Sequence, residues 1–431
     1  MKKILKILII LSSMSLNGCK SSMIVSPFEA APKEHPGTSD DQYDKIPSEN
    51  LNKIGGNIKV QVALFLPFSG KNKELGWNIF NAATLSLFAN DMNNNVELVM
   101  VDSKDTPAEA AQAFKEIVNR KIKIVIGPVF SSAIEAIEND VKRNEITVIS
   151  LSNNQQLADK MYGNGGIFIA GMIPEMQIDK IVSFALDKGK FSFAIIAPNN
   201  QYGTTIHSIF KEVVKNRDAT LVTAEFYENG SDKTIDRVVN RVINSFTLSS
   251  RITRAKNKKN LVVTESDKIY PQVIMVPESG KVLSKIAASI KNQNGDERNF
   301  KIIGTSQWDD ISTVNDPNLV GSWFAAPENK KFREFEKSYF EICHKQPVRV
   351  SSLVYDAVAL VSKMVDYRNG EIPTAKNFVE QTNPPKNGFE GIDGLFRFLP
   401  NGLVQRNLAV LQVGNGKFEI AEEPLDRFLK Y

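Results

Sequence analysis

The sequence is poor in the residues on which most enzymes and metal sites depend. Its 431 residues include only two cysteines and three histidines. The histidines, His35, His207 and His344, stand far apart rather than at the spacing of metal ligands. The sequence has no glycine-rich phosphate loop and no Gly-x-Ser-x-Gly elbow. These absences predict a protein that is not an enzyme and that binds no metal or cofactor.

A large excess of one charge is also missing. The net charge is +4, from 53 basic and 49 acidic residues, so the chain has no strong field for binding nucleic acid. No apolar run after residue 19 is long enough to cross a bilayer. The hydrophobic share of 42% and the charged share of 24% are those of a globular protein, and the length suits two or three compact units.

The first 19 residues have the pattern of a bacterial export signal. Three lysines among the first six residues accompany an apolar run, Ile4–Met14, which is too short for a stable membrane span. The run leads into Leu16-Asn17-Gly18-Cys19, which resembles the lipobox of bacterial lipoproteins. The resemblance implies that residues 1–18 are removed and that Cys19 carries a diacylglycerol. The alternative is an ordinary signal peptide with an incidental cysteine.

A lipid on Cys19 has consequences for the fold and for the location. Cys343 is then the one remaining cysteine, so no disulfide can form within the chain and core packing must hold the fold. Residues 19–57 are polar and lack hydrophobic periodicity, which is typical of a disordered tether spanning on the order of 35 Å. Lys20 stands where an aspartate usually marks retention in the inner membrane. We therefore predict a lipid-anchored periplasmic protein, on the outer rather than the inner membrane of a Gram-negative bacterium.

From residue 58 onward, strand-like and helix-like segments alternate. Sequences that fit a capping box, Thr106–Glu109 and Ser132–Glu135, predict the starts of two helices. A second alternating series begins near Pro174. The order predicts an α/β fold with parallel sheets covered on both faces by helices. Two such series suggest two lobes with a ligand cleft at the carboxyl ends of the strands.

Several segments resemble the type I periplasmic-binding-protein family, whose best-known member is leucine-binding protein. These segments are Val62–Gly70, Asp102–Pro107, Ile126–Ser132 and Asn200–Gly203. Others are similar to the lipoproteins of this family that are classed as penicillin-binding-protein activators. These are Gly171–Glu175, Gly304–Asp310, Gly321–Pro327, Tyr355–Leu360 and Gly388–Phe398.

The resemblance implies a two-lobed fold over residues 58–425, in which each lobe is a parallel sheet flanked by helices. Three crossover segments join the lobes, and we expect them near residues 170–174, 302–305 and 395–398. Lobe 1 then comprises about 57–172 and 305–396, and lobe 2 comprises about 173–304 and 397–425. Three such hinge segments permit closure about the cleft.

The resemblance also implies where a ligand would bind. In the amino-acid-binding members, a serine after the third strand and the amides of the next helix hold the ligand carboxylate, and Ser131 and Ser132 match that place. A helix N-terminus suits an anion, although Ser132 with Glu135 is equally explained by helix capping alone. Tyr202 matches a tyrosine that packs on the ligand, or it only starts a helix and fills the wall. Asn154 replaces the usual threonine.

The place after the second crossing argues against an amino-acid ligand. Amino-acid-binding members carry a glutamate there for the ligand ammonium, whereas this chain has Gln307 and Trp308. A neutral glutamine cannot offset the cost of burying an ammonium group. Asp309 is an alternative partner, but we favour the view that it does not take this role. We therefore predict that the cleft binds another small molecule or nothing.

Two functions follow from the resemblance. The first is a penicillin-binding-protein activator that regulates peptidoglycan synthesis by contact with a bifunctional penicillin-binding protein. The alternative is a receptor that delivers an amino acid or other small molecule to an ABC importer. The chain departs from the best-studied activator, which has a helical-repeat domain where this sequence has only the tether. The basic run Arg251–Lys259 is a solvated loop or a contact with an anionic partner or membrane.

Overall fold

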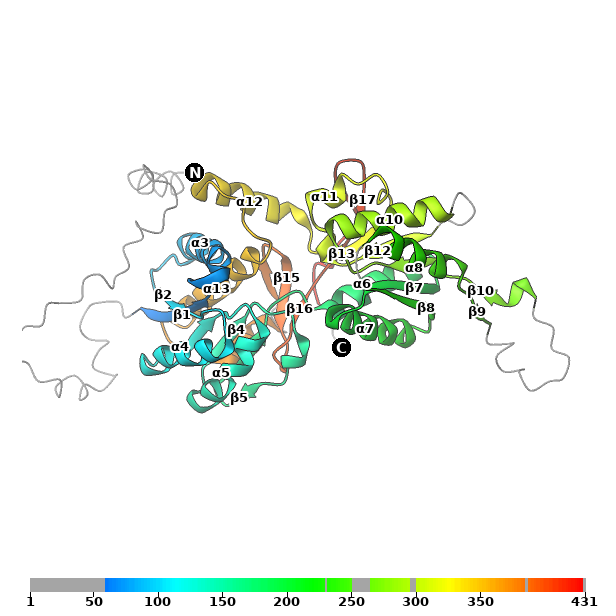
Figure 1. The fold of residues 1–431 in the computed structure, drawn as a ribbon. Helices are drawn as coiled ribbons and strands as arrows, with labels where there is room; N and C mark the ends of the chain where they lie inside the picture. The colour runs from blue at the N-terminus through cyan, green and yellow to red at the C-terminus, as the bar shows by residue number, and fades with distance from the viewer. Residues whose placement is uncertain (1–58, 229–230, 250–263, 295–299, 384–386, 429–431) are drawn as a thin grey trace, which may run out of the picture.

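The computed structural model describes residues 59–228, 231–249, 264–294, 300–383 and 387–428. The leader, Cys19, the tether and the basic run 251–259 lie outside the described residues. The rest folds into two α/β lobes that lie side by side, which confirms the predicted fold class (Figure 1). None of the described helices is long and apolar enough to cross a membrane.

Lobe 1 is built on a sheet with the strand order β2-β1-β3-β4-β6-β5 among the described residues. Its strands are nearly continuous apolar runs because parallel strands between helix layers are buried on both faces. The parallel strands are β1 (Val60–Leu66), β2 (Val96–Asp102), β3 (Ile124–Ile126), β4 (Thr147–Ser150) and β6 (Gly165–Ile169). The short edge strand β5 (Met161–Tyr162) is antiparallel to β6.

Two pairs of helices cover the sheet of lobe 1. Helices α4 (Pro107–Asn119) and α5 (Ser131–Asn144) pack together on one face, and α3 (Lys73–Asn90) and α13 (Ser351–Tyr367) pack together on the other (Figure 1). The predicted capping box at Thr106 is confirmed, since Thr106 and Glu109 bond each other's backbone N–H groups at 3.3 and 3.2 Å. The capping box at Ser132 is wrong, because α5 begins at Ser131 and its N-cap residue, Phe130, makes no side-chain cap bond.

A small antiparallel sheet completes lobe 1. It consists of β14 (Phe389–Gly391), β15 (Gly394–Phe398) and β16 (Val404–Arg406), next to α12 (Asn329–Cys343) and α14 (Ala375–Thr382). The ring of Phe398 lies 4.4 Å from the ring of Phe168 in β6, measured between centroids. This contact joins the small sheet to the core of lobe 1.

Lobe 2 is built on a larger sheet with the described strand order β18-β17-β13-β12-β11-β7-β8. Its parallel strands are β7 (Ser192–Pro198), β8 (Thr220–Tyr227), β11 (Val273–Met275), β12 (Lys301–Gly304) and β13 (Trp323–Ala326). Strands β17 (Ala409–Val413) and β18 (Phe418–Glu422) add an antiparallel edge. Helices α6 (Pro174–Asp187) and α7 (Gln201–Asn216) cover one face, and α8 (Asp232–Asn244) and α10 (Gly280–Asn294) cover the other. A separate hairpin of β9 (Thr247–Leu248) and β10 (Lys268–Ile269) extends from this lobe.

The chain crosses between the lobes three times, and two crossings differ from the prediction. The first lies between β6 and α6, within the expected residues 170–174. The second lies after β13, not at residues 302–305, because β13 pairs with β12 in the sheet of lobe 2. The third lies between β16 and β17, not at residues 395–398, because Phe396 and Phe398 pack in the core of lobe 1. Lobe 2 therefore includes the stretch 305–326 that the sequence analysis assigned to lobe 1.

Candidate functional site

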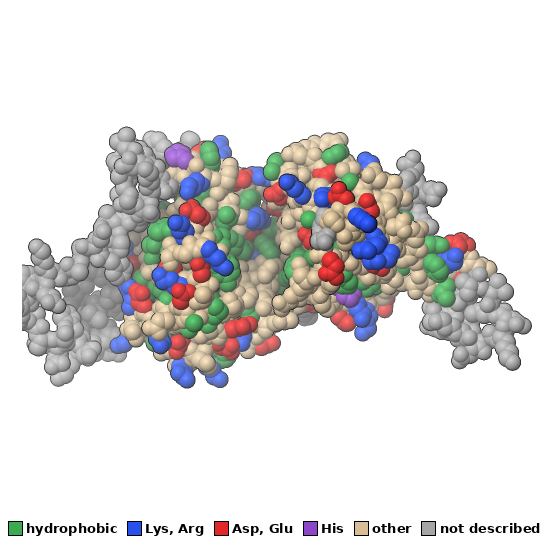
Figure 2. Space-filling model, in the orientation of Figure 1, with side chains coloured by type: hydrophobic (Ala, Val, Ile, Leu, Met, Phe, Trp, Pro, Cys, Tyr) green, Lys and Arg blue, Asp and Glu red, His purple; other side chains and the backbone are tan. Residues whose placement is uncertain are grey.

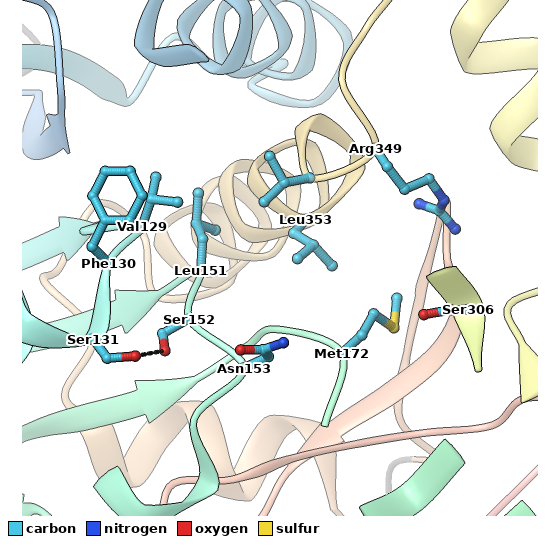
Figure 3. A pocket seen from close by; sticks show the side chains of 11 residues that line it. Val129, Phe130, Ser131, Leu151, Ser152, Asn153, Met172, Ser306, Arg349 and Leu353 are labelled. Carbon is cyan, nitrogen blue, oxygen red and sulfur yellow. Dashed lines mark hydrogen bonds between the residues drawn. The ribbon is translucent and has the colours of Figure 1, made fainter. Parts of the chain in front are cut away.

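A pocket of about 390 Å³ lies between the lobes, at the carboxyl ends of β3 and β4. Figure 2 shows the hollow between the two halves of the molecule, with hydrophobic side chains in it. The lining residues are Val129, Phe130, Ser131, Leu151, Ser152, Asn153, Met172, Ser306, Arg349, Val350 and Leu353. Most of these side chains are apolar, none carries a carboxylate, and Ser306 is the contribution of lobe 2 (Figure 3).

Hydroxyl groups form the polar part of the lobe 1 wall. The Oγ atoms of Ser131 and Ser152 lie 2.8 Å apart, as Figure 3 shows. The Ser152 Oγ also accepts a hydrogen bond from the backbone N–H of Asn154 at 3.1 Å. These contacts link the start of α5 to the loop after β4, so the two serines are fixed within the wall. They remain able to offer hydroxyl groups to a neutral polar ligand.

Two of the predicted lobe 1 residues do not line the pocket. Ser132 lies one residue further into α5, and the turn of the helix gives Ser131 the pocket position instead. Asn154 caps a short 3-10 helix, η4 (Gln155–Leu157), by accepting a hydrogen bond from Gln156 N at 3.1 Å. Its neighbour Asn153 lines the pocket. The sequence analysis therefore found both loops and Ser131, but Ser132 and Asn154 are not the residues that line the pocket.

None of the predicted residues of lobe 2 lines the pocket. Tyr202, near the start of α7, is partly buried. Burial, followed by the nearby Glu278, raises the pKa of Tyr202 to about 12. Gln307 is exposed within the short helix η6 (Ser306–Trp308).

Trp308 is a core residue rather than a ligand-binding one. It is 0% exposed, and its indole Nε1 donates to the carbonyl oxygen of Val276 at 3.2 Å. A Cβ atom at Gly304 would lie 2.1 Å from this ring, so the glycine makes room for it. The expectation that Trp308 lines the cleft is thus wrong in this structure, because the ring turns into the core of lobe 2.

The Asp309 carboxylate, on lobe 2, already contacts two polar side chains of lobe 1. Its Oδ2 lies 3.4 Å from Arg349 Nε, and its Oδ1 accepts a hydrogen bond from Asn329 Nδ2 at 3.1 Å. Its side chain is 5% exposed. Burial raises the pKa of Asp309, although the Arg349 guanidinium acts in the opposite direction. The one acidic candidate of the sequence analysis therefore already has a cationic partner.

Sequence reasoning missed Arg349, which lines the pocket next to Asp309. Its Nη1 lies 2.8 Å from Asp393 Oδ1 and donates to Ser352 Oγ at 2.7 Å. Burial acts to lower the pKa of Arg349, but Asp393 and Asp309 raise it on balance. Arg349 lies in a connecting segment without a motif, so only the folded chain brings it to the cleft.

A second buried ion pair lies behind Arg349. The Asp356 carboxylate accepts hydrogen bonds from Ile392 N at 2.6 Å and Asp393 N at 3.4 Å, and it lies 3.5 Å from Arg406 Nη1. Burial raises the pKa of Asp356 to about 7, and Arg406 offsets this only in part. The family-like segments 355–360 and 388–398 therefore meet here.

A further carboxylate that the sequence analysis missed lies on lobe 2. Glu278 follows β11 and accepts a hydrogen bond from the hydroxyl of Tyr227, at the end of β8. It does not line the pocket. The rule that ligands bind beyond the carboxyl ends of parallel strands would have drawn attention to it. Within the described residues, no group of three or more His, Cys, Asp and Glu side chains could hold a metal ion.

Comparison with solved structures identifies this architecture. A protein from Rhodospirillum rubrum, described as a putative branched-chain amino acid ABC transporter, has a similar fold, with a TM-score of 0.67 and 17% identity. The match covers 84% of this chain and 100% of that one.

Curated proteins from two bacterial genera are similar in sequence. An uncharacterized protein of Rickettsia prowazekii is 26% identical over 272 residues, which are 61% of this chain and 67% of that protein. The penicillin-binding protein activator LpoA of Vibrio cholerae is 21% identical over 181 residues, which are 42% of this chain. The match covers only 29% of the activator's length.

The family model for periplasmic binding proteins matches residues 59–417, a range that contains both sheets and the pocket between them. The chain therefore belongs to the periplasmic-binding-protein family, in its type I, leucine-binding-like form.

Proposed function

We propose that this protein is a lipid-anchored periplasmic regulator of peptidoglycan synthesis, which acts by contact with a bifunctional penicillin-binding protein. The observation that carries the proposal is the charge of the cleft. No pocket-lining residue has a carboxylate, and Asp309 is bonded to Arg349 and Asn329. A free ammonium group would be buried there without a partner, at a cost of several kcal/mol. This argues against an amino-acid receptor.

Two further observations support contact with a synthase. The sequence similarity to the Vibrio cholerae activator extends over 181 residues. The family-like segments 355–360 and 388–398 meet at the buried Asp356, so they maintain the shape of lobe 1 rather than line a ligand site. A binding-protein fold that has no site for an ammonium group can serve another function, such as contact with a protein partner.

The experiment is a reconstitution with the synthases of the same cell. The full-length chain, solubilised in detergent, is mixed with each purified bifunctional penicillin-binding protein, and complex formation and the rate of glycan polymerisation are measured. The Rhodospirillum rubrum protein is the matched control, since it shares the fold at 17% identity. We expect binding and a higher rate with this chain only. Equal results for the two proteins would contradict the proposal.

The pocket supports a second candidate, a receptor for a small molecule other than an amino acid. Its apolar walls and paired serine hydroxyls suit an uncharged ligand with a hydroxyl or carbonyl group. Thermal unfolding in the presence of a metabolite library separates the candidates. A ligand at one hundred times its Kd stabilises the native state by about 2.7 kcal/mol. A shift of that size with leucine would overturn the argument from charge, and one with a neutral solute would favour the receptor.

A further inference from the structure

Arg349 is held firmly on lobe 1. Its Nη1 forms an ion pair with Asp393 Oδ1 at 2.8 Å and donates a hydrogen bond to Ser352 Oγ at 2.7 Å. The guanidinium also lies over the ring of Phe332, with 4.2 Å between Cζ and the ring centroid. Asp393 and Ser352 are buried, and Phe332 is part of the core of lobe 1. The position of the guanidinium is therefore set by lobe 1.

The same guanidinium also reaches lobe 2. Asp309 follows η6 and precedes α11 (Ile311–Val314), both of which precede the second crossing and belong to lobe 2. Its carboxylate bonds Arg349 Nε and Asn329 Nδ2, and Asn329 is the first residue of α12, on the lobe 1 side of that crossing. We call these contacts the Arg349–Asp309 bridge.

The bridge lies directly beside the pocket. Arg349 and Ser306 both line it, and Figure 3 shows the Arg349 side chain extending from the loop before α13 toward the side of the pocket where Ser306 lies. The Arg349 side chain keeps 31% of its surface exposed. Because Arg349 is held on lobe 1 and Asp309 belongs to lobe 2, a change in the angle between the lobes lengthens or breaks the bridge.

Another polar contact between the lobes has a neutral donor and is more exposed to solvent than the Arg349–Asp309 bridge. Gln155 Nε2 donates to Glu175 Oε2 at 2.8 Å, close to the first crossing, where Glu175 is exposed and Gln155 is half-buried. Solvent competes with such a bond, whereas a charged pair with a buried carboxylate loses much more when it separates. The bridge is thus the contact best suited to set the lobe angle.

We propose that Asp309 is a cation-binding site which the chain fills with its own guanidinium, and that this filling holds the lobes together. The ligand class that fits Asp309 is an alkylguanidinium ion, for which Arg349 is the covalently attached substitute. The proposal does not rest on contact with a synthase. It predicts that the lobe angle depends on one buried carboxylate and one cation.

The test measures the distance between the lobes. Spin labels are placed at Lys115→Cys on α4 and Lys211→Cys on α7, two exposed positions, in the full-length chain with its own cysteines replaced by serine. Double electron–electron resonance then gives the distance distribution. We expect Arg349→Ala and Asp309→Asn each to raise the open-to-closed ratio about tenfold, the effect of about 1.4 kcal/mol. Asp179→Asn breaks an exposed ion pair within lobe 2, at 2.7 Å, and should leave the distribution unchanged.

Chemical rescue distinguishes a cation site from a merely structural arginine. Ethylguanidinium should restore the closed distribution of Arg349→Ala, whereas its neutral analogue ethylurea at the same concentration should not. Unchanged distances in both bridge variants, or equal rescue by the two compounds, would overturn the proposal. If Arg349→Ala does not fold, Arg349→Lys replaces it. We expect the distance distribution of Arg349→Lys to be partly open. A distribution identical to that of the Asp179→Asn control would also overturn the proposal.

Discussion

Two arginine–aspartate pairs lie near each other in this protein and differ in what they join. Arg406 and Asp356 both belong to lobe 1, and their side chains are 3% and 2% exposed. Arg349 and Asp309 join lobe 1 to lobe 2, and their side chains are 31% and 5% exposed. Asp393 connects the pairs, because its N–H donates to Asp356 and its carboxylate faces Arg349.

The difference shows how one kind of chemistry serves two purposes. The Asp356 carboxylate is surrounded by backbone N–H groups and by Arg406, so it fixes the loop between β14 and β15 against α13. The Arg349–Asp309 bridge is exposed to solvent on the arginine side, and it joins residues of different lobes. The first pair should therefore govern the stability of lobe 1, and the second the relation between the lobes.

The largest effect is expected from Arg406→Met. This substitution keeps an apolar side chain near Phe396 but leaves the buried Asp356 without its cation, which should lower the free energy of unfolding by about 3 kcal/mol. Urea denaturation at pH 7.5, followed by circular dichroism, measures it. Arg217→Met, which breaks an exposed ion pair, should cost less than about 1 kcal/mol. Equal costs would remove the distinction between the two environments.

Arg349→Met should have the next largest effect on stability. It removes the cationic partner of Asp309 and of the buried Asp393, but solvent at the pocket keeps the loss below that of Arg406→Met, at about 2 kcal/mol. The same urea titration provides the value, for direct comparison with Arg406→Met. A greater loss for Arg349→Met than for Arg406→Met would reverse the assignment of the two pairs.

The pH dependence of stability tests the environment of Asp356. Its pKa is raised from the ordinary value of 3.8 to about 7, so the folded state keeps a proton that the unfolded state releases. This contribution is complete below about pH 4 and is lost as the pH rises to about 7, with a slope of at most about 1.4 kcal/mol per pH unit. Asp356→Asn should flatten the decline between these values in urea titrations. An unchanged slope would show that another group causes it.

The smallest effect is expected from Ser131→Ala. It removes one hydrogen bond in the pocket wall, to Ser152, and should cost about 0.5–1 kcal/mol. Neither ion pair is touched, so the slope with pH should stay that of the unmodified protein. A loss above about 2 kcal/mol would mean that the hydroxyl pair is a structural element rather than part of a binding wall.

The α/β fold was predictable because its parallel strands are short apolar runs that alternate with amphipathic helices. The positions of the crossings between the lobes were harder to predict. The four residues of β13 are apolar and buried, and nothing local shows which sheet they join. One partner, β12, is the preceding strand, but the other, β17, is distant in sequence, and only the pairing in the folded chain decides the lobe.

The site was predictable to the level of loops. Ser131 was found because the resemblance to the amino-acid-binding members implies a serine after the third strand. Asn153 and the orientation of Trp308 depend on backbone turns of one residue, which composition does not encode. Arg349, Asp309 and Asp393 are each separated by 40 or more residues, so no spacing rule joins them.

The point where residue 59 enters the fold has a further consequence for orientation. Val60 N donates to Asn95 O at 2.7 Å, at the amino-terminal end of β1, whereas the pocket lies at the opposite, carboxyl edge of the same sheet. The strand is seven residues long, about 23 Å from edge to edge. A lipid on Cys19 would therefore be joined to the fold at the edge of the sheet that is remote from the pocket.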